Sequence, residues 1–590
     1  MSELASVKSV SNGSPPPDDR EHDLDNYLQP LHIDDGIIHN LAYQFSKVYE
    51  ELALRSDEQF LPTPVTKLPS GQETGQFLAI DVGGTNLRVA FIELLGDADE
   101  QLPSANGADR SRATISNAQR PRVRRTLEKA WPIGEHLKMD KTEDLFAWIG
   151  DCIAEVVNDR LSSDKDKFPV PDELPMGITF SFPMMQDQLS SATLMPMGKG
   201  FTMNSDLDLG STLLQGYARH TRRQSPSRSS PRAKRRKLGP LPQLKITAIT
   251  NDTIATFASL AYTVKSLPNS RVAAGVIVGT GCNATVPMKL SSLGASKVEP
   301  IKRNKPDAIE TVVNTEITIA GACGPLKAIA TEWDRELDEA CARPGFQPLE
   351  YMTGGRYIGE LVRIIFFNYM TKAHRPAIPI ASLPATLVHS YSFTTTFVSA
   401  VIARARSDSE LAGELKRRIP PPESSNWGWT PHTAGALRKI AQLVQVRSAG
   451  LIAASTVGLL ATVGEVALTE PGSPASLPDV PMQSDSKPAS PKSHLSVAQK
   501  QNTRDALSPA PGASAWRSGP EELVIAYTGG IIQHYPNFKE QCQRFIDRLV
   551  MRAGPQDGGK SVFLREARDG GIIGAGVLAG METSEKIAAS

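Results

Sequence analysis

The chain has few cysteines and no excess of either charge. Only five of its 590 residues are cysteine, an odd number without the spacing of metal-ligand pairs. Scattered cysteines of this kind favour a reduced intracellular protein over a disulfide-bonded secreted one. Lys plus Arg and Asp plus Glu number 64 each, so no overall field favours nucleic acid or a membrane surface as a partner.

An apolar targeting or membrane segment is not apparent either. The first 23 residues are polar and rich in Pro and Ser, without an apolar signal core. No run approaches the roughly 20 apolar residues that span a bilayer. We therefore expect a soluble, cytoplasmic protein with no membrane partner and no direct nucleic-acid binding. The length and the 40% hydrophobic content are sufficient for two or more domains with apolar cores.

The first strong signal is a glycine-rich turn between two apolar runs. Phe77–Ile80 breaks at Asp81–Asn86, and the apolar pattern resumes at Leu87–Ile92, which predicts a β-hairpin. The glycines let the backbone approach a ligand closely, and successive N–H groups in such a turn can bind phosphate oxygens. Asp81 could hold the water shell of a Mg²⁺ ion. A structural hairpin with a polar turn is an equal alternative on this segment alone.

A second copy favours the functional interpretation. Val272–Val278 runs into Gly279–Asn283 and continues as Ala284–Met288, again with the pattern of strand, turn and strand. Two such hairpins about two hundred residues apart indicate two related halves that hold one nucleotide.

A strand-to-helix junction supplies a candidate base. Lys245–Thr250 predicts a short strand that ends at Asn251-Asp252-Thr253, and a helix can begin at Ile254. Asp252 would then lie at the rim of a sheet, where α/β proteins bind ligands. Phosphoryl transfer needs a base for the attacking hydroxyl, which makes Asp252 the candidate. The alternative role for Asp252 is a helix N-cap.

The stretch Gly554–Ser561 matches the P-loop pattern but lies in the wrong context. A P-loop needs a strand before it and a helix after it. Here a helical pattern precedes the motif and the apolar run Val562–Leu564 follows it. We interpret it as a surface turn.

A basic run interrupts the middle of the chain. The segment 219–237 is broken by Ser and Pro and ends in Arg232–Lys237, which is almost entirely Lys and Arg. It is either a solvated, disordered insertion or a nuclear-import signal that an import receptor would bind. The second alternative would add the nucleus to the expected location.

The remaining elements follow from periodicity and breakers. Strands are expected at 122–131, 176–180, 523–527 and 562–564. Helices are expected at 33–52, 144–161, 325–339, 361–369, 435–460, 538–551 and from 571. Polar, Ser/Pro-rich composition predicts disorder at 1–30, 96–120 and 470–519.

Four short segments, taken in order, resemble the hexokinase family of the actin-like ATPase superfamily. They are Phe-Ser-Phe-Pro at 180–183, Asn-Asp-Thr at 251–253, Gly-Thr-Gly-Cys-Asn at 279–283 and Asn-Thr-Glu at 314–316. The resemblance covers about Ile33 to Ala579 and implies a two-lobed, ribonuclease H-like α/β fold with a small and a large domain around a cleft. The implied divisions are a disordered N-terminus (1–30), a mostly small-domain region (31–217), a basic insertion (218–243), the large domain (244–469), a disordered insertion (470–519) and a C-terminal part with the nucleotide site (520–590).

The resemblance also implies ATP and Mg²⁺ as cofactors and a sugar as substrate. Asp252 matches the base that deprotonates the sugar's 6-hydroxyl, and Lys199 matches a lysine near the reactive end of the sugar, although a solvated loop is the default place for a lysine. The positions that match sugar contacts are Ser181, Asn251, Asn283, Glu316 and Glu350. The positions on the Mg-ATP side are Asp81, Gly83, Gly84, Thr85, Asn86, Arg88, Thr280, Gly529 and Gly530. Each alone would be typical of a cap, a turn or a surface.

Departures from the family pattern bear on the choice of sugar. Gly198 replaces the Thr of glucose-type hexokinases, Ile317-Thr318 replaces Trp-Gly after Glu316, Thr528-Gly529-Gly530 replaces Asp-Gly-Ser or Asp-Gly-Thr, and Ile573 replaces a basic residue. These features are similar to fungal-type N-acetylglucosamine kinases. Losing a bulky Trp near C1 and C2 could make room for a 2-acetamido group. Added room alone discriminates by only about 1–3 kcal/mol.

Three functions therefore stay open at this point. The leading one is an ATP-dependent N-acetylglucosamine 6-kinase, and the second is a glucose or hexose kinase. The third is a catalytically silent, hexokinase-like regulator in the nucleus, which the basic run favours and the retained Asp252 and Lys199 disfavour.

Overall fold

The computed structural model describes most of the chain outside its termini and insertions. The described residues are 19–96, 122–134, 136–137, 141–163, 172–182, 184–195, 207–221, 241–264, 269–374, 376–472, 521–552, 554, 556 and 559–589. The predicted disorder at residues 1–18, 97–120 and 473–519, the basic run 232–237 and Lys199 lie outside them. These predictions stay untested.

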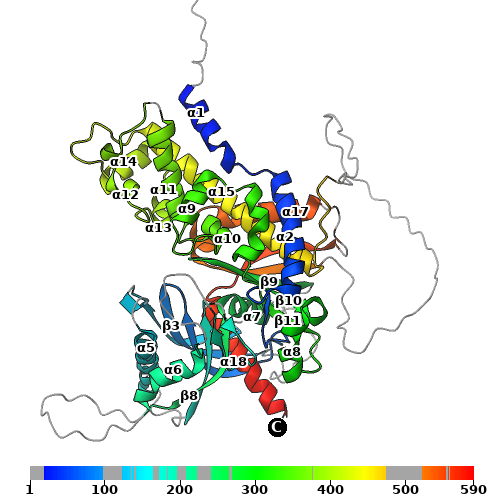
Figure 1. Cartoon of the computed structure of the whole chain (residues 1–590). Coiled ribbons are helices and arrows are strands. Elements are labelled where there is room, and N and C mark those ends of the chain that lie inside the picture. Colours follow the sequence, from blue (N-terminus) through cyan, green and yellow to red (C-terminus); the bar gives the residue numbers. More distant parts are fainter. Residues whose placement is uncertain are drawn as a thin grey trace, which may run out of the picture.

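Two β-sheets organise the molecule into a small and a large lobe (Figure 1). The small-lobe sheet has the order β4-β3-β2-β5-β8, and the large-lobe sheet has the order β1-β11-β10-β9-β12-β13. The small-lobe strands are β2 (Thr74–Val82), β3 (Asn86–Leu95), β4 (Val123–Pro132), β5 (Glu173–Phe180) and β8 (Gln243–Asn251). The large-lobe strands are β1 (Leu61–Pro62), β9 (Ser270–Val278), β10 (Cys282–Lys289), β11 (Glu310–Asn314), β12 (Glu522–Thr528) and β13 (Ser561–Glu566).

Both sheets are covered on both faces. Helices α7 (Asp252–Val264) and α18 (Gly570–Ala589) lie between the two sheets and share an apolar core with both. Helices α5 (Thr142–Ser163) and α6 (Leu209–Tyr217) cover the outer face of the small-lobe sheet. The outer face of the large-lobe sheet packs on α2 (Asp35–Arg55), α15 (Pro431–Thr462) and α17 (Phe538–Arg552). A sheet buried on both faces needs apolar residues at successive positions, which explains the continuous run in β2.

The large lobe carries further helices. They are α8 (Ala295–Asn304), α9 (Glu332–Glu339), α10 (Pro348–Thr353), α11 (Ile358–Asn368), α12 (Ala385–Val388), α13 (Thr395–Phe397), α14 (Asp408–Arg418) and α16 (Gly530–His534). Of these, α9–α14 gather near α15, whereas α8 lies on the other side of the sheet beside β11 (Figure 1). By length and composition alone α15 could cross a membrane, but 89% of its apolar window is buried inside the protein. Its apolar surface is therefore that of a core helix.

The two predicted hairpins are confirmed. Strands β2 and β3 pair from Thr74↔Leu95 to Val82↔Leu87, which leaves residues 83–85 as the turn. Strands β9 and β10 pair up to Val278↔Cys282 around residues 279–281. The predicted junction at Asp252 is confirmed as well, because β8 ends at Asn251 and α7 begins at Asp252. The P-loop-like stretch lies between α17 and β13, in the reversed context that the sequence indicated.

The chain passes between the lobes more often than the predicted divisions imply. Helix α2 packs on α15 of the large lobe, although it falls within 31–217. Strand β8 pairs with β5 in the small-lobe sheet, although it falls within 244–469. Boundaries at 217 and 244 therefore do not separate the lobes, because strand pairing rather than chain order decides which sheet a segment joins.

The prediction of disorder up to residue 30 is wrong from Asp19 onward. Helix α1 (Asp19–Leu28) forms there and continues as a 3₁₀ turn, Gln29–Leu31. Leu24 and Leu28 lie four residues apart on one buried face, and the hydroxyl of Tyr27 accepts a hydrogen bond of 3.1 Å from the Trp333 indole. Burial of one apolar face against the large lobe stabilises this helix, although the composition of the segment is mostly polar.

The helix predicted at 325–339 is divided in two. A 3₁₀ segment, Ala320–Ala328, precedes α9, and Thr331 forms a capping box with Asp334 at the start of α9. Side-chain hydrogen bonds at Thr331 satisfy the first backbone N–H groups of a new helix, so the chain restarts there.

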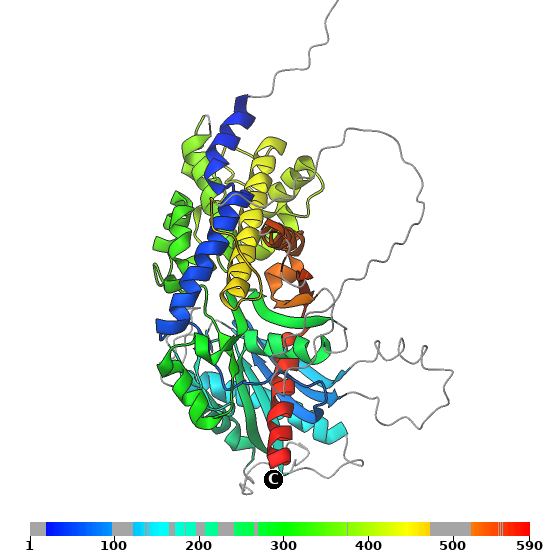
Figure 2. The ribbon, with the colours of Figure 1, turned by 90° about the vertical axis from the view of Figure 1, so that its right-hand side faces the viewer.

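Helix α18 leaves the junction between the lobes and runs along the small lobe to the C-terminus (Figures 1 and 2). It approaches α7 so closely that a Cβ atom at Gly574 would lie 1.9 Å from the carbonyl oxygen of Ala255. A Cβ at Gly177 of β5 would meet the Ala575 carbonyl oxygen at the same distance. The close packing of α18 against α7 and β5 therefore depends on glycine at positions 574 and 177.

We expect Gly574→Ala to lower the free energy of unfolding by about 3 kcal/mol or more, because the backbone of α7 cannot yield as a flexible side chain can. Gly413→Ala, in the middle of α14, is the matched control, since an added Cβ there meets only the end of the Arg417 side chain at 3.9 Å. That control should gain about 0.5–1 kcal/mol from helix propensity. Urea unfolding measures both variants, and equal stability of the two would contradict the packing argument.

Candidate functional site

A pocket between the lobes gathers most of the predicted sugar-side residues. Gly84 and Ser181 enter it from the small lobe, and Asp252 enters it from the start of α7. The full lining is Gly84, Ser181, Asn251, Asp252, Ile277, Thr280, Gly281, Cys282, Asn283, Glu316, Gln347 and Glu350. The hairpin turns at 83–85 and 279–281 thus face one another across the same pocket.

Asn251 provides a side-chain cap for α7. Its Oδ1 atom accepts hydrogen bonds from the backbone N–H of Thr253 at 2.9 Å and from the Thr253 hydroxyl at 2.6 Å. Its Nδ2 group donates to the carbonyl of Phe182 at 3.3 Å, which ties α7 to the end of β5. Asp252 is the first residue of α7 and keeps part of its surface exposed in the pocket. The positive end of the helix dipole favours a carboxylate at this place.

Glu316 is held from three directions in a left-handed backbone conformation with φ = 48°. One carboxylate oxygen accepts hydrogen bonds from the amides of Asn283, at 3.0 Å, and Asn314, at 2.9 Å. Its backbone N–H donates to Oδ1 of Asn283 at 3.1 Å, and its carbonyl accepts from Gln59 at 2.9 Å. The side chain is buried, so each of these contacts replaces a hydrogen bond to water.

Glu350 is 1% exposed and closes the pocket from α10. Its Oε2 atom accepts a hydrogen bond of 3.1 Å from the backbone N–H of Cys282. The carboxylate also lies over Gly281, where an added Cβ would be only 2.4 Å from Oε2. Because Gly281 has no side chain, the carboxylate of Glu350 can lie directly against the second hairpin turn.

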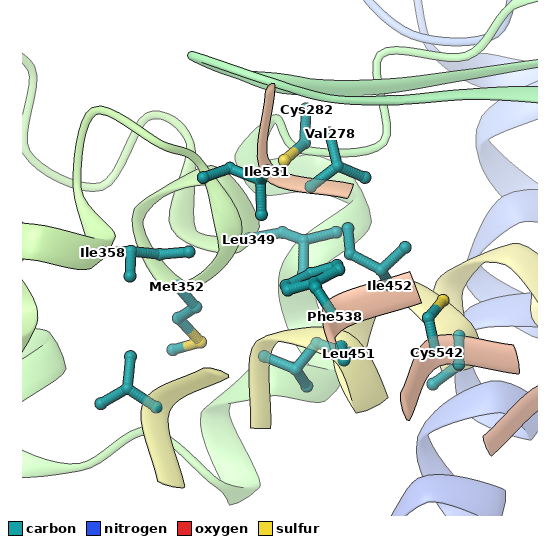
Figure 3. Close-up of a cluster of buried hydrophobic side chains, with 14 of the residues drawn as sticks. Val278, Cys282, Leu349, Met352, Ile358, Leu451, Ile452, Ile531, Phe538 and Cys542 are labelled. Carbon is teal, nitrogen blue, oxygen red and sulfur yellow. The ribbon is translucent and has the colours of Figure 1, made fainter. Parts of the chain in front are cut away.

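An apolar core supports these elements from below. Figure 3 shows Val278 and Cys282, at the facing ends of β9 and β10, above Leu349 of α10 and Ile531 of α16. The same cluster continues to Ile452 of α15 and to α17. The helix that carries Glu350 and the helix that begins at Gly530 thus rest on one packed core, which fixes their positions relative to the second hairpin.

The first hairpin and α18 place an acidic group beside the pocket. Burial raises the pKa of Asp81 to about 7, and the charges of Asp252 and Asp569 add to this effect, while Arg88 opposes it. A Cβ at Gly571, in the first turn of α18, would lie 2.7 Å from Oδ2 of Asp81. A buried carboxylate near two other acids is a site that a divalent cation would stabilise, since Mg²⁺ prefers oxygen ligands.

The predicted nucleotide side borders open space. An added Cβ at Gly84 or at Gly530 would meet no atom within 4 Å, so both backbones leave room for a ligand. Gly529 has φ = 118°, and its backbone lies against Val278 and Gly279 at the second hairpin. These features fit a phosphate-bearing ligand with its metal ion between the two hairpins.

Not every predicted residue lines the pocket. Arg88 bonds to Glu128 at 2.7 Å and to Asp569 at 2.5 Å, so its guanidinium is used within the small lobe and at α18. The predicted residues that do not line this pocket are Asp81, Gly83, Thr85, Asn86, Arg88, Gly529 and Gly530. Lys199 and the neighbouring Gly198 are outside the described residues.

The sequence prediction missed three polar contributors. Asn314 donates a hydrogen bond to Glu316, and in the sequence it was part of the Asn-Thr-Glu motif without a role of its own. Gln347 lines the pocket three residues before Glu350, in a turn without a distinctive pattern. Gln59, from the segment before β1, contacts a residue 257 positions away, and no local pattern marks such a contact.

Comparisons with known proteins cover almost the whole chain. Two sequence models, both described as hexokinase, match residues 23–262 and 273–581. The chain is 26% identical to Hexokinase-1 of Nicotiana tabacum, over 88% of this chain and 82% of that protein. It is also 26% identical to Hexokinase-5 of Oryza sativa subsp. japonica, over 90% of this chain and 83% of that protein.

A solved structure has a similar fold. The hexokinase of Schistosoma mansoni complexed with glucose superposes with a TM-score of 0.64 at 22% identity, covering 95% of this chain and 98% of that chain. This likeness concerns the fold, and it confirms the predicted two-lobed α/β architecture.

We expect Asp81→Asn to make the protein more stable at pH 8, but not at pH 4. The pKa of Asp81 rises from its usual value of 3.8 to about 7 on folding, so the folded state binds more protons than the unfolded state between these values. Stability is therefore lost as pH rises through this window, and the neutral variant escapes that loss. The gain at pH 8 should be about 2–4 kcal/mol, measured by urea unfolding at both pH values.

Asp307→Asn, on an exposed loop, is the control for removing one carboxylate. It should follow the wild-type pH profile. An Asp81→Asn variant that follows the same profile would show that this carboxyl group is not destabilised by burial.

Proposed function

This chain belongs to the hexokinase family of sugar kinases, and we propose that it transfers the terminal phosphoryl group of ATP to the 6-hydroxyl of N-acetylglucosamine. The observation that carries the proposal is the convergence of Asp252 with Asn283, Glu316 and Glu350 in one pocket. A sugar needs several buried donors and acceptors, because each hydroxyl that leaves water must be paired again.

Asp252 is the general base in this proposal. It is the first residue of α7, and its place in the pocket lets it accept the proton of the attacking hydroxyl. Asn251 caps the same helix and ties it to β5, which fixes the direction of the carboxylate. Lys199 remains a prediction for the reactive end of the sugar.

The phosphate side of the reaction falls between the hairpins. Backbone N–H groups of the turns at 83–85 and 279–281 would bind phosphate oxygens, and Asp81 would hold the hydrated metal ion. Bound Mg²⁺ would neutralise charge on the phosphates during transfer. Arg88 supports this side indirectly, through its ion pair with Asp569 just before α18.

The choice of sugar rests on the loop after Glu316. No indole follows this glutamate: Ile317 packs into the core of the large lobe, and the hydroxyl of Thr318 accepts a hydrogen bond of 3.4 Å from the amide of Gln347. Gln347 itself lines the pocket. A carboxamide offers two N–H donors and a carbonyl acceptor, so after one N–H is given to Thr318, the second N–H and the oxygen match the C=O and N–H of an acetamido group.

A glucose or hexose kinase is the second candidate. The relatives in two plants are named hexokinases, and the solved structure from Schistosoma mansoni contains glucose. Those names favour a sugar with a free 2-hydroxyl, whereas the residues that follow Glu316 favour a 2-acetamido group.

The first experiment measures ADP release by the purified full-length protein with Mg-ATP and either sugar. We expect a higher kcat/KM with N-acetylglucosamine than with glucose, and a loss of about 10²–10⁴-fold in Asp252→Ala, the range that a positioned base contributes. Asp307→Ala is the control and should retain activity. A preference for glucose would establish the second candidate, and silence on both sugars from a folded protein would favour the catalytically silent regulator.

A second experiment tests Gln347. We expect Gln347→Ala to reduce kcat/KM for N-acetylglucosamine about tenfold more than for glucose, because one lost hydrogen bond to the acetamido group is worth about 1.4 kcal/mol. Gln445→Ala, at a buried glutamine on α15, is the matched control and should change both sugars equally or not at all. If Gln347→Ala reduced kcat/KM equally for both sugars, Gln347 would not determine the choice between them.

A further inference from the structure

The segment Gln59–Thr66, which we call the strap, runs beside the strand that leads into Glu316. We propose that Gln59 is a positioning residue for the sugar site: it fixes the backbone of Glu316, and Lys297 in turn fixes Gln59. This inference rests on the proposed function, because it assigns Glu316 to the sugar. Gln59 is not among the residues that line the pocket.

The strap is paired to β11 along its length. Leu61 lies opposite Asn314 and Pro62 opposite Val313 in the large-lobe sheet. The N–H of Thr63 donates to the Val312 carbonyl at 3.1 Å. The strap therefore follows β11 to its end, where Thr315 and Glu316 begin the loop.

At that end the side chain of Gln59 acts as a clamp, because it is hydrogen-bonded to two carbonyl groups of the loop. Its side chain is 2% exposed, and its Nε2 group donates to the carbonyl oxygens of Glu316 at 2.9 Å and Ile319 at 3.4 Å. Its Oε1 atom lies against Gly321, where an added Cβ would be 2.2 Å away. One carboxamide thus holds both the start and the middle of the loop 316–321.

The loop needs such a clamp because its backbone is unusual. Glu316 has φ = 48°, and Phe60, the neighbour of Gln59, has φ = 53°. Left-handed conformations are unfavourable for residues with a Cβ and persist only where the surroundings determine them. The N–H of Phe60 donates to the carbonyl of Thr315 at 3.1 Å, so one left-handed residue is hydrogen-bonded to the residue directly before the other.

The two faces of Glu316 are fixed independently. Asn283 accepts from its N–H at 3.1 Å, and Asn283 and Asn314 donate to its carboxylate. The side chain of Gln59 donates to the carbonyl of Glu316 at 2.9 Å. The same carbonyl also accepts a hydrogen bond of 3.1 Å from the backbone N–H of Ile319. Without Gln59 the peptide that follows Glu316 would keep only this bond within the loop and lose its tie to the strap, so the carboxylate would be held less firmly in the pocket.

Lys297 anchors the clamp. Its side chain, 9% exposed, comes from α8, and its Nζ group donates to the carbonyl oxygens of Leu52 at 3.0 Å, Gln59 at 2.7 Å and Phe60 at 3.1 Å. Three carbonyls satisfy the three donors of the ammonium group. Lys297 therefore joins the end of α2, the strap and α8 at one point below the loop.

The test compares Gln59→Leu with wild type on the sugar that the wild-type enzyme phosphorylates. We expect the KM for the sugar to rise about tenfold, with the KM for ATP unchanged and kcat within about threefold, because the clamp acts on Glu316 and not on the nucleotide side. Gln445→Leu is the matched control for replacing a buried glutamine and should leave both KM values unchanged. An unchanged sugar KM in folded Gln59→Leu, or an equal rise in the ATP KM, would overturn the proposal.

A double-mutant cycle tests the anchor. Lys297→Met should raise the sugar KM, and the double variant Gln59→Leu/Lys297→Met should match the more affected single variant rather than multiply the two effects. Multiplied effects would show that Lys297 does not act through Gln59.

Glu316→Gln separates this inference from the proposed function. A rise in sugar KM in Glu316→Gln with none in Gln59→Leu would overturn the clamp alone. An unaffected Glu316→Gln would overturn the assignment of Glu316, and a wild-type protein that neither turns over nor is thermally stabilised by either sugar would overturn both.

Discussion

The close approach of α7 and α18 between the two sheets is the constraint on which the rest of the molecule depends. Gly574 lets α18 lie against the carbonyl of Ala255, and the two helices together form the layer that both sheets share. Both helices begin near the same pocket: Asp252 is the first residue of α7, and Asp81 lies against Gly571 in the first turn of α18. The packing of one layer therefore places two carboxylates near the positive ends of two helix dipoles.

Burial at the cleft has opposite effects on stability and on function. Burial raises the pKa of Asp81 to about 7, because it disfavours the charged form of this carboxyl group. Glu316 occupies a left-handed conformation, and Glu350 is almost completely buried. Strained backbone conformations and perturbed pKa values that occur together at one place are typical of functional sites. The apolar core beneath α10 and α16 supplies the stability that offsets them.

The parts that the sequence predicted are those with local patterns. The hairpins at 83–85 and 279–281 combine apolar runs with glycine turns, and Asp252 follows a strand and begins a helix, so neighbouring letters were sufficient. Gln59 and Gln347 were missed because their partners, Glu316 and Thr318, lie far away in sequence and no periodicity connects them. Helix α1 was missed because the prediction followed the polar composition of the segment and not its single apolar face. The ion pair of Arg88 with Asp569 was not predicted either, because it joins residues 481 positions apart.

The departures from the family pattern are unevenly distributed over the site. The frame that holds Glu316, made by Asn283, Asn314 and Gln59, is fully hydrogen-bonded, and Glu350 keeps its contact with the second hairpin. Of the described departures, Ile317 and Thr318 directly follow Glu316, Thr528 precedes the glycines at the start of α16, and Ile573 lies in the first turn of α18. A chain that had lost the use of its sugar site would have no reason to maintain buried polar groups that cost free energy when unpaired. The intact frame beside an altered loop is the pattern expected when the substrate changes and the chemistry stays.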